Sequence, residues 1–177
     1  MSDLVKNIFR LALFISVQVF VLNEIPHLHR YVVPYLYFLF LLWLPFSLNR
    51  LGLLLTGFAT GLVLDYFTMS PGLHTAACVL IAYVRPFIIF LLIPKEAAEF
   101  TYHEPSPRGM GWGPYLVYAV ILTLLHHTYL RLLVWLQFGS FLDFLIKTAT
   151  STAISMLLIL TTELLFPRRM KYRTNTA

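Results

Sequence analysis

Three polar residues near the junction of two apolar stretches are of the types that carry chemistry inside a membrane. Asp65 lies near the end of one stretch, His74 opens the next, and Arg85 follows eleven residues later. A charged side chain within a membrane costs about 2.5–3.5 kcal/mol on insertion scales, so each needs a specific reason to be there. Carboxylate, imidazole and guanidinium groups that face one bundle interior can form a path for ions or protons.

Helical spacing places the first of these groups on a packing face. Gly57, Gly61 and Asp65 are each four residues apart, so they lie along one side of a helix. Gly57 and Gly61 form a GxxxG pattern, which lets a second helix approach closely. We therefore expect Asp65 to point into the bundle. Packing within the chain is the favoured interpretation of the pattern, because apolar segments often contain it by chance.

The second stretch places Arg85 on the same side as His74. Eleven residues return an α-helix to nearly the same face, so Arg85 is expected to face inward, roughly 16 Å deeper than His74. Pro86 removes one backbone hydrogen bond and favours a kink, and the freed carbonyl is an expected local partner for the guanidinium. At the outer end, Asp65 and His74 are expected at similar depth, where they can form a hydrogen bond or ion pair.

Two interpretations of these residues stay open. In the structural interpretation, Asp65 caps or pins the turn, and Arg85 donates a hydrogen bond to a backbone carbonyl freed by the kink. In the other, they belong to an ion or proton path. We favour the structural interpretation, because a path needs polar residues at intermediate depths and only Thr75 and Cys78 lie there.

The last two apolar stretches carry a second polar group. Asp143 and Lys147 have the i,i+4 spacing of a helical ion pair, and Arg131 comes to a similar depth across the Gly139 turn. We predict a small ion-pair cluster there. A zinc site is not expected, because no pair of the six histidines has H-x-x-x-H spacing. GxSxG and Walker motifs are also missing, so neither catalytic residues nor a cofactor is predicted.

A run of small residues follows Lys147. Ala149 and Ala153, and likewise Ser151 and Ser155, repeat the small-xxx-small spacing of closely packed membrane helices. We expect close packing at this face, either inside the chain or against a partner protein.

The elements that position these residues are predicted to be membrane-spanning helices. Hydrophobic residues make up 59% and charged residues 12% of the 177 positions, against about 45–50% and about 25% in soluble domains. A chain of this length has too little interior to hide that excess from water. We predict an all-α integral membrane protein, one transmembrane domain over 1–177, with six spans of roughly 20 residues: 7–23, 31–48, 51–68, 73–94, 114–138 and 140–166.

Basic residues predict how these spans are oriented. With the N-terminus inside, nine basic residues fall on the inner side and only Arg30 on the outer side. Since positive charge favours the cytoplasmic side, both termini, the loop 95–113 and the tail 167–177 are predicted to be cytoplasmic. The tail is expected to contact anionic lipid through Arg168, Arg169, Lys171 and Arg173.

The chain resembles the MreD family of bacterial rod shape-determining membrane proteins. The resemblance rests on three runs: Gly57-Phe58-Ala59-Thr60-Gly61-Leu62-Val63-Leu64-Asp65-Tyr66-Phe67, Ser70-Pro71-Gly72-Leu73-His74-Thr75-Ala76-Ala77-Cys78 and Tyr83-Val84-Arg85-Pro86. It implies a six-helix fold similar to the substrate-binding subunits of energy-coupling-factor vitamin transporters. Outside the third and fourth spans the match is one of hydropathy alone. Only the Gly/Asp positions of the third span and the Gly72/His74 turn are carried over, as packing candidates.

The resemblance also implies a function. A family member is a non-enzymatic scaffold of the cell-wall elongation complex in the bacterial cytoplasmic membrane, where it binds an MreC-like protein and works with RodA, a class B penicillin-binding protein, RodZ and MreB. We expect docking of partner transmembrane helices on small-residue faces. The alternative is a substrate-binding membrane subunit of a vitamin transporter, which should have an outer cavity with ligand-binding loops, whereas the outer turns here are short.

Overall fold

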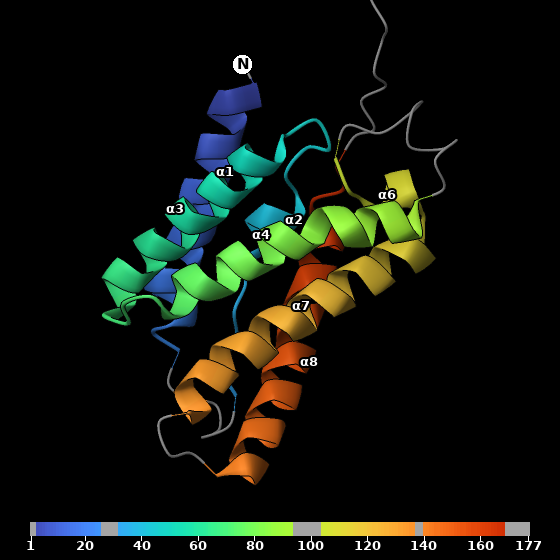
Figure 1. Cartoon of the computed structure of the whole chain (residues 1–177). Coiled ribbons are helices and arrows are strands. Elements are labelled where there is room, and N and C mark those ends of the chain that lie inside the picture. The colour runs from blue at the N-terminus through green and yellow to red at the C-terminus, as the bar shows by residue number, and fades with distance from the viewer. Residues whose placement is uncertain (1–2, 26–31, 94–103, 137–139, 169–177) are drawn as a thin grey trace, which may run out of the picture.

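The computed structural model describes residues 3–25, 32–93, 104–136 and 140–168, and this part of the chain is helical with no strand (Figure 1). Its elements follow in chain order: α1 (Asp3–Val17), the π-helix η1 (Gln18–Leu22) that continues it, α2 (Leu39–Leu42), α3 (Arg50–Thr68), α4 (Leu73–Leu92), α6 (Pro107–Met110), α7 (Trp112–Trp135) and α8 (Phe141–Leu165).

Five helices within the described residues are long and apolar enough to cross a membrane. They are Val5–Leu22, Arg50–Thr68, Leu73–Leu92, Trp112–Trp135 and Phe141–Leu165. Large apolar side chains such as Phe20, Leu55, Phe90 and Leu157 are exposed on their outer faces. The predicted all-helical class is thus confirmed, and the five spans lie within a few residues of their predicted bounds.

The prediction of a helix over 31–48, the second of the six predicted spans, was wrong. Residues 32–36 have no regular structure, α2 has only four residues, and residues 45–49 are again non-helical. Pro34 and Pro45 lack the backbone N–H that a helix interior needs, and each disfavours a helical residue before it. Every residue from Leu36 to Leu44 is at most 8% exposed. Hydropathy could not distinguish a non-helical segment buried in protein from a lipid-facing helix, because both are continuously apolar.

This stretch, residues 32–48, is called here the buried segment. Figure 1 shows it running up through the molecule, from the end where η1 stops to the opposite end where α3 begins. The other helices surround it, and its side chains form the centre of the core with residues of α1, α4 and α7 such as Phe14, Ile81 and Leu122. Non-helical backbone at membrane depth is tolerated only when protein surrounds it, as protein does here.

The α3–α4 hairpin is held by close backbone contact at the predicted GxxxG face. A Cβ atom on Gly61 would lie 2.6 Å from the Thr75 nitrogen and 2.7 Å from the His74 carbonyl oxygen. A Cβ atom on Gly57 would lie 2.9 Å from the Ala82 Cβ. Both glycines therefore serve packing inside the chain, and at Gly61 the neighbour is backbone that cannot move aside.

Replacing Gly61 with alanine should loosen this hairpin. Because the added methyl group meets backbone atoms of α4, we expect Gly61→Ala to lower the free energy of unfolding by about 1–3 kcal/mol. Gly113→Ala is the matched control, since no atom lies within 4 Å of a Cβ there. Unfolding in neutral detergent micelles measures both, and equal stability of the two variants would contradict the close packing.

Candidate functional site

Gln18, on η1, supplies hydrogen bonds to the start of the buried segment. Its Oε1 accepts from the backbone N–H of Leu36 at 2.8 Å and of Tyr37 at 3.4 Å. Its Nε2 donates to the Pro34 carbonyl at 3.1 Å. The Gln18 side chain is fully buried. One amide therefore replaces several of the hydrogen bonds that a helix would have made for this stretch.

Two serines on α8 continue this pattern. The Ser151 hydroxyl accepts from the Val33 N–H at 3.4 Å, and the Ser155 hydroxyl accepts from the Tyr35 N–H at 3.0 Å. Both serines are fully buried. The small-residue face of α8 thus packs inside the chain through its hydroxyls. Ala149 and Ala153, on the other side of the helix, are exposed.

Arg85 provides hydrogen bonds to the backbone at the far end of the buried segment. Its Nη2 donates to the Leu44 carbonyl, and its Nε donates to the Tyr118 hydroxyl at 2.9 Å. Tyr118 in turn donates to the Leu42 carbonyl at 2.9 Å. Arg85 is 2% exposed, so its predicted inward orientation is confirmed. The carbonyl it reaches belongs to the buried segment and not to the turn that Pro86 disturbs.

Asp65 binds the turn between α3 and α4. Its carboxylate accepts from the backbone N–H groups of Gly72 (3.0 Å), His74 (2.9 Å) and Thr75 (3.0 Å), and from the Thr75 hydroxyl (2.6 Å). These are the N–H groups that a helix leaves unpaired at its start. Asp65 therefore caps α4, and it contacts His74 through the backbone. Gly72 adopts φ +86°, a left-handed conformation that favours glycine.

A buried imidazole cluster lies beside the buried segment. The Tyr37 hydroxyl lies 2.9 Å from His74 Nδ1 and 2.7 Å from His126 Nε2, so one phenol joins two rings. His127 contacts the Thr123 carbonyl through Nδ1 at 2.8 Å and Ser155 through Nε2 at 3.1 Å. Because a carbonyl only accepts, Nδ1 of His127 carries the proton.

Proton movement through this cluster is limited. Tyr37 has one hydroxyl hydrogen, so it can donate to only one of its two histidines at a time. Nδ1 of His126 is buried and has no hydrogen-bond partner in the described residues. Where the structure describes the chain, the hydrogen-bonded run therefore stops at His126. No group of three or more His, Cys, Asp or Glu side chains in the described ranges is arranged to hold a metal ion.

A partly buried ion cluster joins the two ends of the described chain. Arg168 pairs with Glu163 at 2.8 Å and with Glu104 at 3.7 Å, and Arg10 pairs with Glu104 at 2.8 Å. The Arg168 guanidinium also lies 4.2 Å from the centre of the Trp43 ring. Its side chain is only 9% exposed, so the predicted lipid contact of Arg168 is replaced by carboxylates. Arg169, Lys171 and Arg173 lie outside the described residues.

The predicted outer ion cluster forms only in part. Lys147 and Asp143 pair at 4.0 Å. Arg131 has no ion pair within the described residues, and its Nε and Nη2 atoms are buried without a hydrogen-bond partner.

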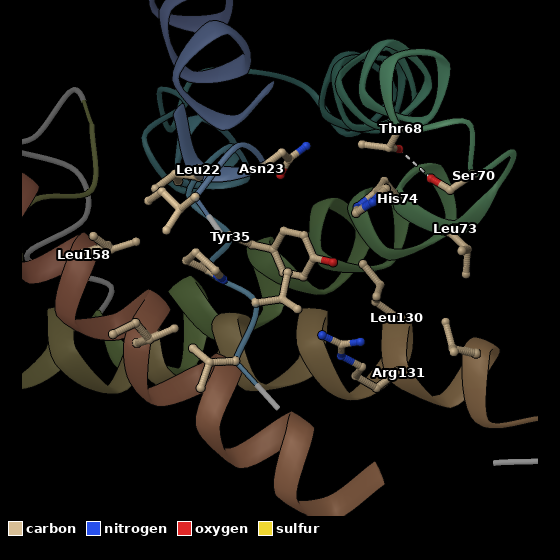
Figure 2. Close-up of a pocket in the computed structure, with 16 residues that line it drawn as sticks. Leu22, Asn23, Tyr35, Thr68, Ser70, Leu73, His74, Leu130, Arg131 and Leu158 are labelled. Carbon is tan, nitrogen blue, oxygen red and sulfur yellow. Dashed lines mark hydrogen bonds between the residues drawn. The ribbon is translucent and has the colours of Figure 1, made fainter. Parts of the chain in front are cut away.

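A cavity of about 510 Å³ opens beside Arg131 (Figure 2). It lies where the end of η1, the start of the buried segment, the α3–α4 turn, α7 and α8 meet. Its lining is mainly apolar, with a few polar side chains among them: Leu22, Asn23, Ile25, Val32, Val33, Pro34, Tyr35, Thr68, Ser70, Leu73, His74, Leu130, Arg131, Val134, Ile154 and Leu158. The short outer turns do not predict such a cavity.

Several of the polar residues that form the buried hydrogen bonds and ion pairs could not be recognised from the sequence. Gln18, Tyr37 and Tyr118 fall within predicted apolar spans, and no motif marks Glu163. The available signal was a polar side chain within each span, which predicts an inward position but not its partner.

Comparison of the chain with protein-family models, curated proteins and solved structures found no match.

Removing the Gln18 amide should destabilise the buried segment. Gln18→Leu leaves two N–H groups and one carbonyl unpaired in an apolar core, so we expect a loss of about 2–5 kcal/mol in the free energy of unfolding. Ser16→Ala, on an exposed position of α1, is the control and should change little. Denaturant titration in mixed micelles makes the comparison, and a Gln18→Leu variant as stable as the control would refute this role.

Proposed function

We propose that this chain is a non-enzymatic membrane scaffold of the cell-wall elongation machinery, similar in role to the MreD family. The motif resemblance in the third and fourth spans motivates the proposal. The observation that carries it is the exposure of Ala149 and Ala153 on α8. They are the one predicted small-residue pair left open to a partner in the described residues, because α4 already occupies the Gly57/Gly61 face.

The mechanism is helix docking against a rigid surface. Two alanines one turn apart let the backbone of another helix approach closely, and dispersion contacts then hold it in the membrane. Exposed apolar side chains on the same helix, such as Leu145 and Leu157, extend the contact. The occupant we propose is the transmembrane helix of an MreC-like protein. RodA, a penicillin-binding protein, RodZ and MreB belong to the same proposed assembly.

The proposed setting is the bacterial cytoplasmic membrane, with both termini in the cytoplasm. Glu104 pairs with Arg10 near the start of the chain and with Arg168 after α8, so these two regions lie at one end of the bundle. The excess of positive charge in the sequence supports the proposal that this end faces the cytoplasm. In this arrangement the chain makes six passages, of which the second is the buried segment and not a helix.

Bulky residues at the docking face should release the partner. We expect Ala149→Leu and Ala153→Leu, combined, to reduce capture of a co-expressed MreC-like protein by at least about tenfold, because the added side chains keep the helix backbones apart. Leu55→Phe, on an exposed position of α3, is the control for bulk. Affinity purification from detergent extracts with quantification of the partner measures the effect, and undiminished capture by the double variant would contradict the proposal.

A second candidate function rests on the cavity of about 510 Å³. Sites for small molecules are mainly apolar clefts of about 300–1,000 Å³ with a few placed polar groups. The cavity fits that description, so a substrate-binding subunit of a vitamin transporter is the alternative to a scaffold.

A thermal-shift screen with vitamins separates the two candidates. A transporter subunit should be stabilised by its vitamin by about 2.7 kcal/mol at a ligand concentration 100 times Kd. For the scaffold we expect no vitamin to raise the unfolding temperature. Stabilisation by one vitamin that Leu158→Trp abolishes, since this change narrows the cavity, would favour the transporter and count against the scaffold.

A further inference from the structure

Arg131 lies inside the membrane-spanning part of the chain and has no counter-ion among the described residues. Nε and Nη2 of its guanidinium are buried and donate to no partner within the described residues. Asp143 lines a smaller hollow on another side of Arg131, but its ion pair is with Lys147 at 4.0 Å. An arginine held in this way normally has a carboxylate, a phosphate or several carbonyls as partners, since burying an unpaired charge is costly.

The Arg131 side chain lines the cavity beside a second hydrogen-bond donor. Figure 2 shows Arg131 of α7 and Tyr35 of the buried segment directed toward a common space, with His74 of α4 nearby. The Tyr35 hydroxyl has no hydrogen-bond partner where the structure describes the chain, and the backbone N–H of Tyr35 donates to Ser155. A guanidinium and a phenol that both donate into one space match the oxygens of an acidic group.

The remainder of the cavity is suited to hydrocarbon. Leu22, Leu73, Leu130, Ile154 and Leu158 supply its walls. No carboxylate side chain lines it among the described residues; the nearby Asp65 carboxylate lies behind the wall, where it accepts hydrogen bonds from Ser70 and from the His74 N–H. A ligand that matches both parts must combine one acidic head with an apolar body.

We propose that this cavity binds an anionic amphiphile, with a carboxylate or phosphate head held by Arg131 and Tyr35 and an apolar body lying against the leucine and isoleucine walls. Arginine suits this head group because its planar fork can donate two parallel hydrogen bonds. A membrane lipid and a diffusible small amphiphile share this chemistry. At about 510 Å³ the cavity holds a single-chain ligand, or only the head and the adjacent part of a two-chain lipid. The site is separate from the Ala149/Ala153 face, so it does not rest on partner docking.

Binding of defined probes to the full chain in neutral detergent tests this site. Dodecyl phosphate should raise the unfolding temperature in a saturable manner, while dodecanol and inorganic phosphate, which each lack one half of the ligand, should bind at least about tenfold more weakly. Competition by phosphatidylglycerol but not phosphatidylcholine, in nanodiscs, would identify a lipid as the source. Absence of that competition would identify a diffusible amphiphile, and either result supports the shared chemistry.

Variants locate the binding at Arg131. Arg131→Gln should weaken dodecyl phosphate binding at least about tenfold, and Arg131→Lys less, because lysine keeps the charge but loses the two-pronged geometry. Arg50→Gln removes an equal charge at the opposite end of the molecule and should leave binding unchanged. Should Arg131→Gln not fold, Leu73→Trp tests the cavity without altering charge and should abolish binding. Equal binding of dodecanol and dodecyl phosphate, or unchanged binding by the Arg131→Gln and Leu73→Trp variants, would overturn the proposal.

Discussion

The backbone hydrogen bonds of the buried segment are the requirement on which the rest of the structure depends. A peptide group left unpaired in an apolar interior costs several kcal/mol, and a non-helical segment cannot pair its own groups. Surrounding helices supply the missing donors and acceptors through five side chains: Gln18, Arg85, Tyr118, Ser151 and Ser155. Through these side chains, η1, α4, α7 and α8 are held around the buried segment.

The same requirement accounts for the polar groups that first suggested an ion or proton path. Arg85 is engaged by the Leu44 carbonyl and Tyr118, and Asp65 caps α4 through backbone N–H groups. Neither is left to carry a moving charge, so the structural interpretation accounts for both. Arg131 differs because its donors remain unpaired within the described residues. It lies near the start of the buried segment and forms part of the cavity wall. The non-helical residues 32–35 of the buried segment also line this cavity, in which we propose that a ligand binds.

Prediction from the sequence succeeded where local pattern determines structure. The spacing of Gly57 and Gly61 predicted a close helix pair, and eleven-residue periodicity placed Arg85 inward. It failed at 31–48, because hydropathy reports burial from water and does not distinguish lipid from protein as the apolar surroundings. Since Pro34 and Pro45 were not weighed against the apolar run, the partners of Gln18, Ser151 and Arg85 could not be derived. Likewise the sequence predicts lipid contact for Arg168 because Glu104 is distant in sequence and the nearby Glu163 carries no motif that marks it as a partner.

The backbone conformation of the buried segment is the most direct test of this account. Backbone Cα chemical shifts of the full chain in micelles, measured by nuclear magnetic resonance together with amide hydrogen exchange, report it residue by residue. The structure predicts non-helical shifts over residues 32–36, helical shifts limited to the neighbourhood of Leu39–Leu42, and slow exchange of the Leu36 amide, which donates to Gln18. Unbroken helical shifts through residues 31–48, or fast exchange at Leu36, would contradict it.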